Sequence, residues 1–491
     1  MLLLGIDVGT SSIKASVIDA ATQNIIASAQ YPETEADIIS LQTGWAEQSP
    51  NQWWSDVQVA IKKVNASGKF NPKEIGAIGI AYQMHGLVVI DKAGNALRNS
   101  IIWCDSRAVP YGEAAFEKIG KVKSLQCLLN SPGNFTAAKL AWVKENEPEL
   151  YEKIDKIMLP GDFIAYKLTN HITTSPSALS EGIFWDFKNN EISKDVLEYF
   201  GYDEKIFPEL QDVFSNHGTV TKTVADELGL QEGIPVTYKA GDQPNNALAL
   251  NVLNAGEVAA TAGTSGVIYG VDDNLVFDNE SRLNSFAHVN HTKNKTRVGV
   301  LLCINGTGIM NRYVRNLAGA NLSYKEFDKL ASSINAGSDG LHILPFGNGA
   351  ERIFNNKIVG AHFTNIDLNK HTNAHFFRAA QEGIAFAFKY GFDIMHSNGM
   401  QPTMIRAGKA NMFLSSVFSE VFVNTIGVPV ELYDADGSVG AAKGAGIGVK
   451  FYSSAEEACT TQKSLAVIEP KDVNLYQELY HDWYVSLLKF I

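Results

Sequence analysis

The sequence predicts an α/β protein of two similar halves, and three observations support that prediction. Short apolar strands alternate with helical patterns along most of the 491 residues. A chain of this length is too long for one core, so two large domains are expected. Residues 1–19 and 258–273 also repeat each other: each segment is an apolar strand, a Gly-Thr-Ser turn and a second strand ending in Asp. The fold class is therefore α/β with an internal duplication.

The first half of the chain opens with three strands and then alternates helices with strands. Residues 2–8 and 13–18 flank the first Gly-Thr-Ser turn, and 25–31 is the next apolar segment. A Ser-Pro start followed by apolar residues at helical spacing predicts a helix over 48–65. Further strands are expected at 75–80, 88–91, 101–103 and 234–239, and further helices at 136–146 and 148–157.

The second half restarts at Gly256 with the repeated strand-turn-strand unit. Apolar periodicity predicts five helices, the last of them rich in Gly and Ala, at 307–317, 324–333, 375–395, 410–426 and 436–452. The boundary between the halves is placed between residues 242 and 256, with a cleft between them. The expected division is 1–249, 250–450 and a helical tail over 451–491.

The two Gly-Thr-Ser turns are candidate anion clips. Backbone N–H groups in such a turn point at anionic oxygens, glycine allows a close approach, and the hydroxyls add donors. Taken singly, each turn is better explained as an ordinary hairpin with Ser/Thr turn residues. Their repetition favours two halves that close on one polyphosphate. The candidate residues are Gly9, Thr10, Ser11, Gly263, Thr264 and Ser265.

Bulk properties exclude several classes of protein. The formal net charge of −12 argues against a nucleic-acid-binding protein, which needs a basic footprint. The four cysteines are scattered without metal-ligand spacing, so a reducing cytoplasm is the simpler expectation. The apolar run at 2–4 is too short for a signal peptide, and no run of about 18 apolar residues predicts a membrane span.

A duplicated strand-turn-strand clip resembles the actin-like ATPase superfamily, and further segments resemble one branch of it, the FGGY carbohydrate kinases. The segments that carry this resemblance occur in family order and are Gly-Ile-Asp-Val-Gly-Thr-Ser at 5–11, Trp-Ala-Glu-Gln-Ser-Pro at 45–50, Gln-Met-His-Gly at 83–86, Trp-Cys-Asp-Ser-Arg at 103–107, Phe-Thr-Ala-Ala-Lys-Leu-Ala-Trp at 135–142, Gly-Asp at 241–242, Gly-Thr-Ser-Gly at 263–266 and the small residues at 437–442. The resemblance implies two actin-like ATPase (ribonuclease H-like) domains: a sugar-binding domain over 1–249 and a nucleotide-binding domain over 250–450.

The resemblance also assigns two carboxylates. The family Asp that matches Asp242 takes the proton from the sugar hydroxyl as a general base. The alternative for Asp242 is a helix cap at the following residues. The carboxylate that matches Asp7 helps to hold Mg²⁺, often through water, and the alternative is an Asp that stabilises the turn.

Sugar-contacting positions follow from the same resemblance. They are Met84 through its backbone, His85 through its imidazole and Gln243 through its amide. Xylulokinases commonly carry Asn at the last of these positions, and Gln is closer to other FGGY branches such as glycerol kinase. Whether the 103–107 segment walls the sugar pocket or braces the domain stays open.

The segment that matches the family's adenosine-binding residues departs from the family pattern. Where the family has Gly-Gly-Gly-Ala beneath the adenosine, residues 407–411 read Ala-Gly-Lys-Ala-Asn. Gly408 keeps one position of close approach, and Lys409 either pairs with a phosphate or points to water.

The resemblance implies an ATP- and Mg²⁺-dependent kinase of a small ketose, with the Gln-Met-His-Gly segment favouring the xylulokinase branch and D-xylulose. Two alternatives stay open: a kinase for sedoheptulose, ribulose, gluconate or glycerol, and a sugar-binding pseudokinase whose nucleotide site has decayed. The expected partner is a small-molecule sugar. Members of the family are often homodimers, but the sequence shows no decisive interface stripe.

Overall fold

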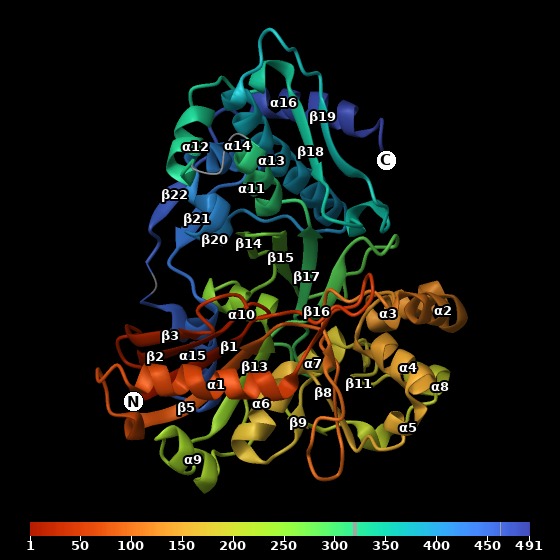
Figure 1. Cartoon of the computed structure of the whole chain (residues 1–491), viewed down its shortest axis with the longest axis vertical. Helices are drawn as coiled ribbons and strands as arrows, with labels where there is room; N and C mark the ends of the chain where they lie inside the picture. The colour runs from red at the N-terminus through yellow and green to blue at the C-terminus, as the bar shows by residue number, and fades with distance from the viewer. Residues whose placement is uncertain (318–321, 462) are drawn as a thin grey trace.

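The computed structural model describes residues 1–317, 322–461 and 463–491, which form two lobes, each built on one large sheet (Figure 1). The first sheet has five strands in the order β13-β5-β1-β2-β3, and the second has seven in the order β16-β17-β15-β14-β20-β21-β22. The bounds in the first sheet are β1 Leu2–Val8, β2 Ile13–Asp19, β3 Ile25–Tyr31, β5 Ile75–Tyr82 and β13 Val236–Gly241. Those in the second are β14 Val258–Ala262, β15 Gly266–Asp272, β16 Asn284–Ala287, β17 Val298–Ile304, β20 Ile405–Gly408, β21 Val430–Tyr433 and β22 Ala466–Ile468.

The two sheets repeat one topology. In the first, β1 pairs antiparallel with β2 and β2 with β3, whereas β5 runs parallel to both β1 and β13. In the second, β14, β15 and β17 form the same antiparallel meander, and β20 runs parallel to β14 and β21. Strands β16 and β22 extend the two edges of the second sheet. The predicted α/β duplication is therefore confirmed by strand order and direction.

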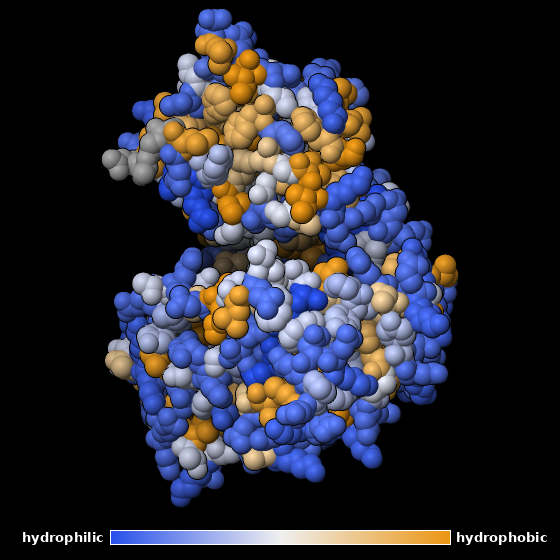
Figure 2. All heavy atoms as spheres, turned by 45° about the vertical axis from the view of Figure 1, so that its right-hand side comes forward, coloured by the Kyte–Doolittle hydropathy of each residue, from blue (hydrophilic) through white to orange (hydrophobic). Residues whose placement is uncertain are grey.

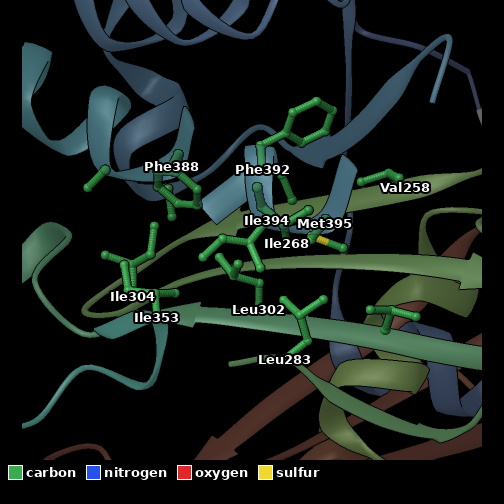
Figure 3. Close-up of a cluster of buried hydrophobic side chains, with 14 of the residues drawn as sticks. Val258, Ile268, Leu283, Leu302, Ile304, Ile353, Phe388, Phe392, Ile394 and Met395 are labelled. Carbon is green, nitrogen blue, oxygen red and sulfur yellow. The ribbon is translucent and has the colours of Figure 1, made fainter. Parts of the chain in front are cut away.

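Helices cover both sheets. Helix α1 (Pro50–Asn65) packs on β2 and β3; Ser49 caps it and Pro50 begins it, as expected for a residue with no N–H to satisfy. In the second lobe the long α13 (Asn373–Ser397) packs on α11 (Gly308–Leu317), α12 (Tyr324–Ala331) and α14 (Ser416–Ile426). Figure 3 shows side chains of α13, among them Phe388 and Met395, meeting Ile268 and Leu302 of the sheet.

Helix α15 (Gly437–Gly448) follows β21 in the chain but packs on β1, β5 and β13 of the first sheet. Small residues on both surfaces allow this close contact. A Cβ atom at Gly5 would overlap the backbone oxygen of Ser438, and one at Gly79 would overlap that of Ala441. Helix α10 (Asp242–Ala249), which follows β13, contacts α15 and reaches β14 and β15 of the second sheet.

The remaining elements are short or lie outside the two sheets. The helices are α2 Val109–Ile119, α3 Lys121–Leu128, α4 Thr136–Asn146, α5 Pro148–Tyr151, α6 Pro160–Thr169, α7 Pro176–Glu181, α8 Lys194–Phe200, α9 Lys222–Leu228 and α16 Val473–Leu487. The short strands are β4 Glu47–Gln48, β6 Val88–Ile90, β7 Ser100–Ile101, β8 Lys156–Met158, β9 Thr173–Thr174, β10 Trp185–Asp186, β11 Glu191–Ile192, β12 Glu209–Leu210, β18 His342–Phe346 and β19 Gly360–Thr364. The 3-10 turns are η1 Pro72–Glu74, η2 Glu204–Ile206, η3 Ser338–Gly340, η4 Arg352–Phe354, η5 Asn411–Leu414 and η6 Glu457–Cys459.

Most predicted helices agree with the structure to within two residues at each end, and three differ by more. The helix expected over 148–157 stops at Tyr151, because the apolar residues that follow pair with β6 as strand β8. The helix expected over 410–426 is split, since Ser415 caps a new helix, α14, after η5. The helix expected over 436–452 begins and ends inside those bounds, as α15.

A deep hollow separates the two lobes on the face shown in Figure 2. Among the described residues, no helix is long and apolar enough to cross a bilayer.

Candidate active site

The candidate catalytic carboxylates lie at one edge of the first sheet. Strands β1, β5 and β13 run parallel, so their carboxyl ends meet at the same edge, the usual place for a ligand site in an α/β protein. Asp7 lies near the end of β1, the 83–86 segment follows β5, and Asp242 follows β13. Residues from three separate parts of the chain are thereby brought together.

Asp242 is the first residue of α10 and is half-buried. Gly241 occupies the N-cap position, and the Asp242 carboxylate accepts a hydrogen bond from the Gln243 N–H in the first turn of the helix, so Asp242 has the helix contact of the alternative interpretation as well. Burial raises the pKa of this carboxyl to about 7, and the nearby charge of Asp7 adds to the increase. Its proton affinity therefore suits a group that accepts a proton near neutral pH.

Asp7 faces the start of α15. A Cβ atom at Gly437 would overlap its carboxylate, so only glycine allows this approach. The pKa of Asp7 is raised to about 6, mainly by burial and secondly by the neighbouring charge of Asp436, while the charge of Lys14 opposes the increase. Lys14 forms its ion pair with Asp436, which also caps α15 by accepting hydrogen bonds from the Ser438 and Val439 N–H groups. The Asp7 charge is therefore left for another cation.

These surroundings fit Mg²⁺. No group of three or more His, Cys, Asp or Glu side chains within the described ranges could enclose a metal ion by itself. A cation at Asp7 would complete its shell with water and phosphate oxygens, which is the coordination that Mg²⁺ adopts beside nucleotides.

The first turn is held by the side chains of Gln83, Trp103 and Gln48, the last of which donates from Nε2 to the Thr10 carbonyl oxygen at 2.8 Å. The Gly9 N–H donates to the Ser12 carbonyl at 3.1 Å. The Thr10 hydroxyl donates to Gln83 Oε1 at 3.1 Å and accepts from the Trp103 indole at 3.0 Å. The Thr10 hydroxyl proton is therefore used inside the protein, whereas Ser11 is exposed.

The second turn borders a cavity of about 540 Å³ in the other lobe. Gly263 and Thr264 line it, and their carbonyl oxygens accept hydrogen bonds from Gly308 and Ile309 at the start of α11. Ser265 lies outside the lining and contacts Cys303. Gly408 and Lys409 are also outside it, and the loop contributes Asn411 and Met412 instead. The sequence did not identify the other lining residues, among them Tyr324, Lys325, Asp328, Gln381 and Ser415.

The predicted sugar-contacting residues lie beside Asp242. Met84 is buried, and a Cβ atom at Gly241 would lie 2.6 Å from its Cγ atom. The His85 ring stands edge-on to Phe135, with centroids 4.8 Å apart, and lies 5.3 Å from the ring of Phe286. Gln243 is half-buried as the second residue of α10.

Phe286 reaches this site from the second sheet. Its strand, β16, is bound to the first lobe by three side chains. Asn130 exchanges hydrogen bonds with the backbone of Ser285, Ser180 accepts one from the Ala287 N–H at 2.9 Å, and Ser177 donates one to the Ala287 carbonyl oxygen at 2.8 Å. Both lobes therefore contribute aromatic side chains around His85.

Residues of the 103–107 segment have two different roles: two brace the domain and one contacts the first turn. Asp105 and Arg107 are buried as an ion pair with N–O distances of 2.7 to 3.0 Å, and Arg107 also pairs with Glu47. These two side chains brace the domain. Trp103, 48% exposed, contacts Thr10 of the first turn.

Comparison with known proteins agrees with this architecture. The family model of the N-terminal domain of the FGGY carbohydrate kinases matches residues 2–249, and that of the C-terminal domain matches 258–448. A xylulose kinase of Staphylococcus epidermidis is 30% identical over 98% of this chain and 95% of its own.

Two solved structures share the fold. The xylulose kinase of Rhodospirillum rubrum, 24% identical, superposes with a TM-score of 0.88 over 100% of this chain and 99% of its own. The Plasmodium falciparum glycerol kinase with ADP, 21% identical, also reaches 0.88, over 100% and 98%. The predicted pair of actin-like ATPase domains is thus confirmed, and the chain belongs to the FGGY family of carbohydrate kinases.

Proposed function

We propose that this carbohydrate kinase transfers the terminal phosphoryl group of ATP to a small ketose, with D-xylulose as the preferred substrate and D-xylulose 5-phosphate as the product. The observation that carries the proposal is the pairing of Asp7 and Asp242 beside Met84 and His85. The names of the relatives support the choice of sugar, since relatives 30% and 28% identical over 98% and 86% of this chain are xylulose kinases.

Phosphoryl transfer needs in-line positioning, charge neutralisation and a proton acceptor for the attacking hydroxyl. Asp242 is the proposed acceptor of the sugar hydroxyl proton, because its carboxyl is half-buried beside the sugar-contacting residues. Asp7 would hold Mg²⁺, which when bound neutralises charge on the phosphate oxygens. The N–H groups of the two Gly-Thr-Ser turns, one on each lobe, are the proposed phosphate donors, except that of Gly9, which donates to Ser12. Gly408 with Lys409 would lie near the nucleotide.

The two alternatives differ in what supports them. Gln243, in place of the Asn that xylulokinases commonly carry, favours another polyol such as glycerol or gluconate. A pseudokinase would need neither a proton acceptor nor a metal carboxylate, and the cavity beside the second turn is large enough for a nucleotide base. The kinase is therefore the better supported function.

The deciding experiment is a panel of sugars with the purified protein, ATP and Mg²⁺, followed by coupled measurement of ADP release. We expect D-xylulose to give the highest kcat/KM among xylulose, ribulose, sedoheptulose, gluconate and glycerol. A clear preference for another polyol would replace the proposed substrate. ATP binding by calorimetry without ADP release on any sugar would favour the pseudokinase.

Gly263→Val should raise the KM for ATP about tenfold, or about 1.4 kcal/mol of binding free energy. Gly263 lines the cavity, and a Cβ atom there would lie 3.7 Å from both the Asn411 side-chain nitrogen and the Ser265 oxygen. A single methyl group therefore fits, whereas the two γ-carbons of valine enter the nucleotide space. Gly263→Ala is the matched control, and the KM for the sugar should stay unchanged in both variants. An unaltered KM for ATP in the valine variant would contradict the assignment of this turn.

A further inference from the structure

His85 has a left-handed backbone conformation, which residues other than glycine rarely adopt. Its φ angle is +63°. Such strained residues persist only when their surroundings hold them, and they gather at functional sites. The N–H of His85 donates to Glu181 Oε2 at 3.3 Å, and its carbonyl oxygen accepts from Lys139 Nζ at 2.9 Å and from the Thr136 hydroxyl at 3.2 Å.

The main chain at residue 181 determines which nitrogen of the imidazole carries the proton. The Nδ1 atom of His85 lies 3.0 Å from the backbone carbonyl oxygen of Glu181. A carbonyl oxygen only accepts hydrogen bonds, so Nδ1 must be the protonated nitrogen and Nε2 must carry the lone pair. Burial, together with Lys139 and Arg352, lowers the pKa of the imidazole to about 3, so the ring is neutral at any working pH.

The Nε2 atom is the group that this arrangement leaves for a ligand. Within the described part of the chain, no residue forms a hydrogen bond with it, and the His85 side chain keeps 17% of its surface exposed. A neutral Nε2 is an acceptor only. The group that meets it must therefore be a hydrogen-bond donor.

Glu181 is itself fixed, at the end of α7. Its side chain is 2% exposed, and its Oε1 atom accepts a hydrogen bond from the buried Tyr82 hydroxyl at 2.7 Å. A Cβ atom at Gly241 would lie 3.3 Å from Glu181 Oε2, so this carboxyl group packs against the residue that precedes Asp242. One side chain thus joins Tyr82, His85 and the strand end that carries the proposed base.

We propose that Glu181 is a positioning residue that presents His85 Nε2 as a hydrogen-bond acceptor, so that this subsite takes a hydroxyl group of the substrate and rejects a carbonyl or carboxylate oxygen there. The proposal rests on the proposed function, because it describes how that site selects its sugar. A hydroxyl donates to Nε2, whereas a keto oxygen or a carboxylate would place two lone pairs against each other.

Substrate analogues test the polarity of the subsite without changing the protein. The wild-type enzyme would be assayed with D-xylulose and with analogues in which the hydroxyl at C1, C3 or C4 is replaced by hydrogen or by fluorine. At the position that meets His85, the deoxy analogue should raise the KM about tenfold or more. The deoxyfluoro analogue should be no better, because fluorine can accept a hydrogen bond but cannot donate one. Recovery of most of the affinity by fluorine at that position would overturn the proposal.

Variants of Glu181 test the positioning role. Glu181→Met removes the acceptor for the His85 N–H while keeping most of the volume, and it should raise the sugar KM about tenfold with a smaller change in kcat and none in the KM for ATP. It should also abolish the penalty of the deoxy analogue, since the misplaced imidazole no longer meets that hydroxyl. Glu181→Gln is the matched control. Its amide oxygen can accept from His85 and its amide nitrogen can donate to Tyr82, so its kinetics should stay close to the wild type.

The outcomes separate this inference from the function on which it rests. Absence of turnover with every ketose would reject the proposed function. Normal D-xylulose turnover with an unchanged sugar KM in Glu181→Met would reject the positioning role alone. If Glu181→Met does not fold, as judged by circular dichroism, the fluorinated analogues on the wild-type enzyme still decide the polarity.

Discussion

Asp242→Asn should lower kcat by about 10²- to 10⁴-fold while the Kd of the sugar stays nearly unchanged. The amide keeps the shape and polarity of the side chain but cannot take the proton of the attacking hydroxyl. Steady-state kinetics and calorimetric titration of the sugar would measure the two quantities. Asp56→Asn is a suitable control. Asp56 is a buried carboxylate that accepts a hydrogen bond from Gln52, but it lies on α1 and is not one of the candidate site residues. Retention of more than about a tenth of the wild-type kcat in Asp242→Asn would exclude Asp242 as the general base.

The raised pKa of Asp242 predicts how activity and stability change with pH. The base must be deprotonated, so kcat/KM of the wild-type enzyme should fall as the pH drops below about 7, the pKa of Asp242 in the free protein. Because this pKa is raised on folding, the stability that the protonated group contributes is present below about pH 4 and is lost as the pH rises through 7. Asp242→Asn should therefore melt at a higher temperature than the wild type at pH 8, and at a similar one at pH 3.5. A lower melting temperature at pH 8 would contradict this assignment of the pKa.

Gly79→Ala should strongly destabilise the protein, although it adds only one methyl group. The added Cβ atom would overlap the backbone oxygen of Ala441, so helix α15 would have to move away from the sheet. Overpacking typically costs about 1–3 kcal/mol and more when backbone must move, which corresponds to a fall in melting temperature of about 2–6 °C for a lobe of roughly 250 residues. Differential scanning calorimetry or urea unfolding would measure it.

Gly76→Ala provides the matched control. Gly76 lies on the same strand, β5, but its added methyl group would clash only with the flexible Met1 side chain and would lie 3.8 Å, an ordinary contact distance, from the Leu2 carbonyl oxygen. We expect this variant to unfold close to the wild type. If the Gly79 and Gly76 variants melted at the same temperature, the close packing of α15 on this strand would be refuted.

The internal duplication could be predicted because its signal is local. An apolar strand, a Gly-Thr-Ser turn and a second strand are contiguous in the chain, and both copies form as expected. The position of α15 could not be predicted this way. Its Gly and Ala residues show that something packs closely, but only the tertiary structure identifies the partner as the sheet of the other lobe.

The residues of the candidate site differ in the same way: some have a local sequence signal and others do not. Asp7 and Asp242 each stand at the end of an apolar strand within a short motif, so the sequence itself points to them. Glu181 gives no such signal, because its hydrogen bonds join α7 to segments 96 and 99 residues earlier in the chain. The lining of the cavity was missed for the same reason, since Tyr324 and Gln381 come from separate helices that meet only in the folded lobe.

The packing of α15 on the sheet of the other lobe has a genetic consequence. A gene fragment that stops after residue 249 would encode the first sheet without α15, which covers β1, β5 and β13 in the intact chain. The polypeptide from such a truncation would expose a wide apolar face and depend on its missing counterpart for solubility. Activity in this enzyme is therefore expected from split genes only when both products are made together and reassociate.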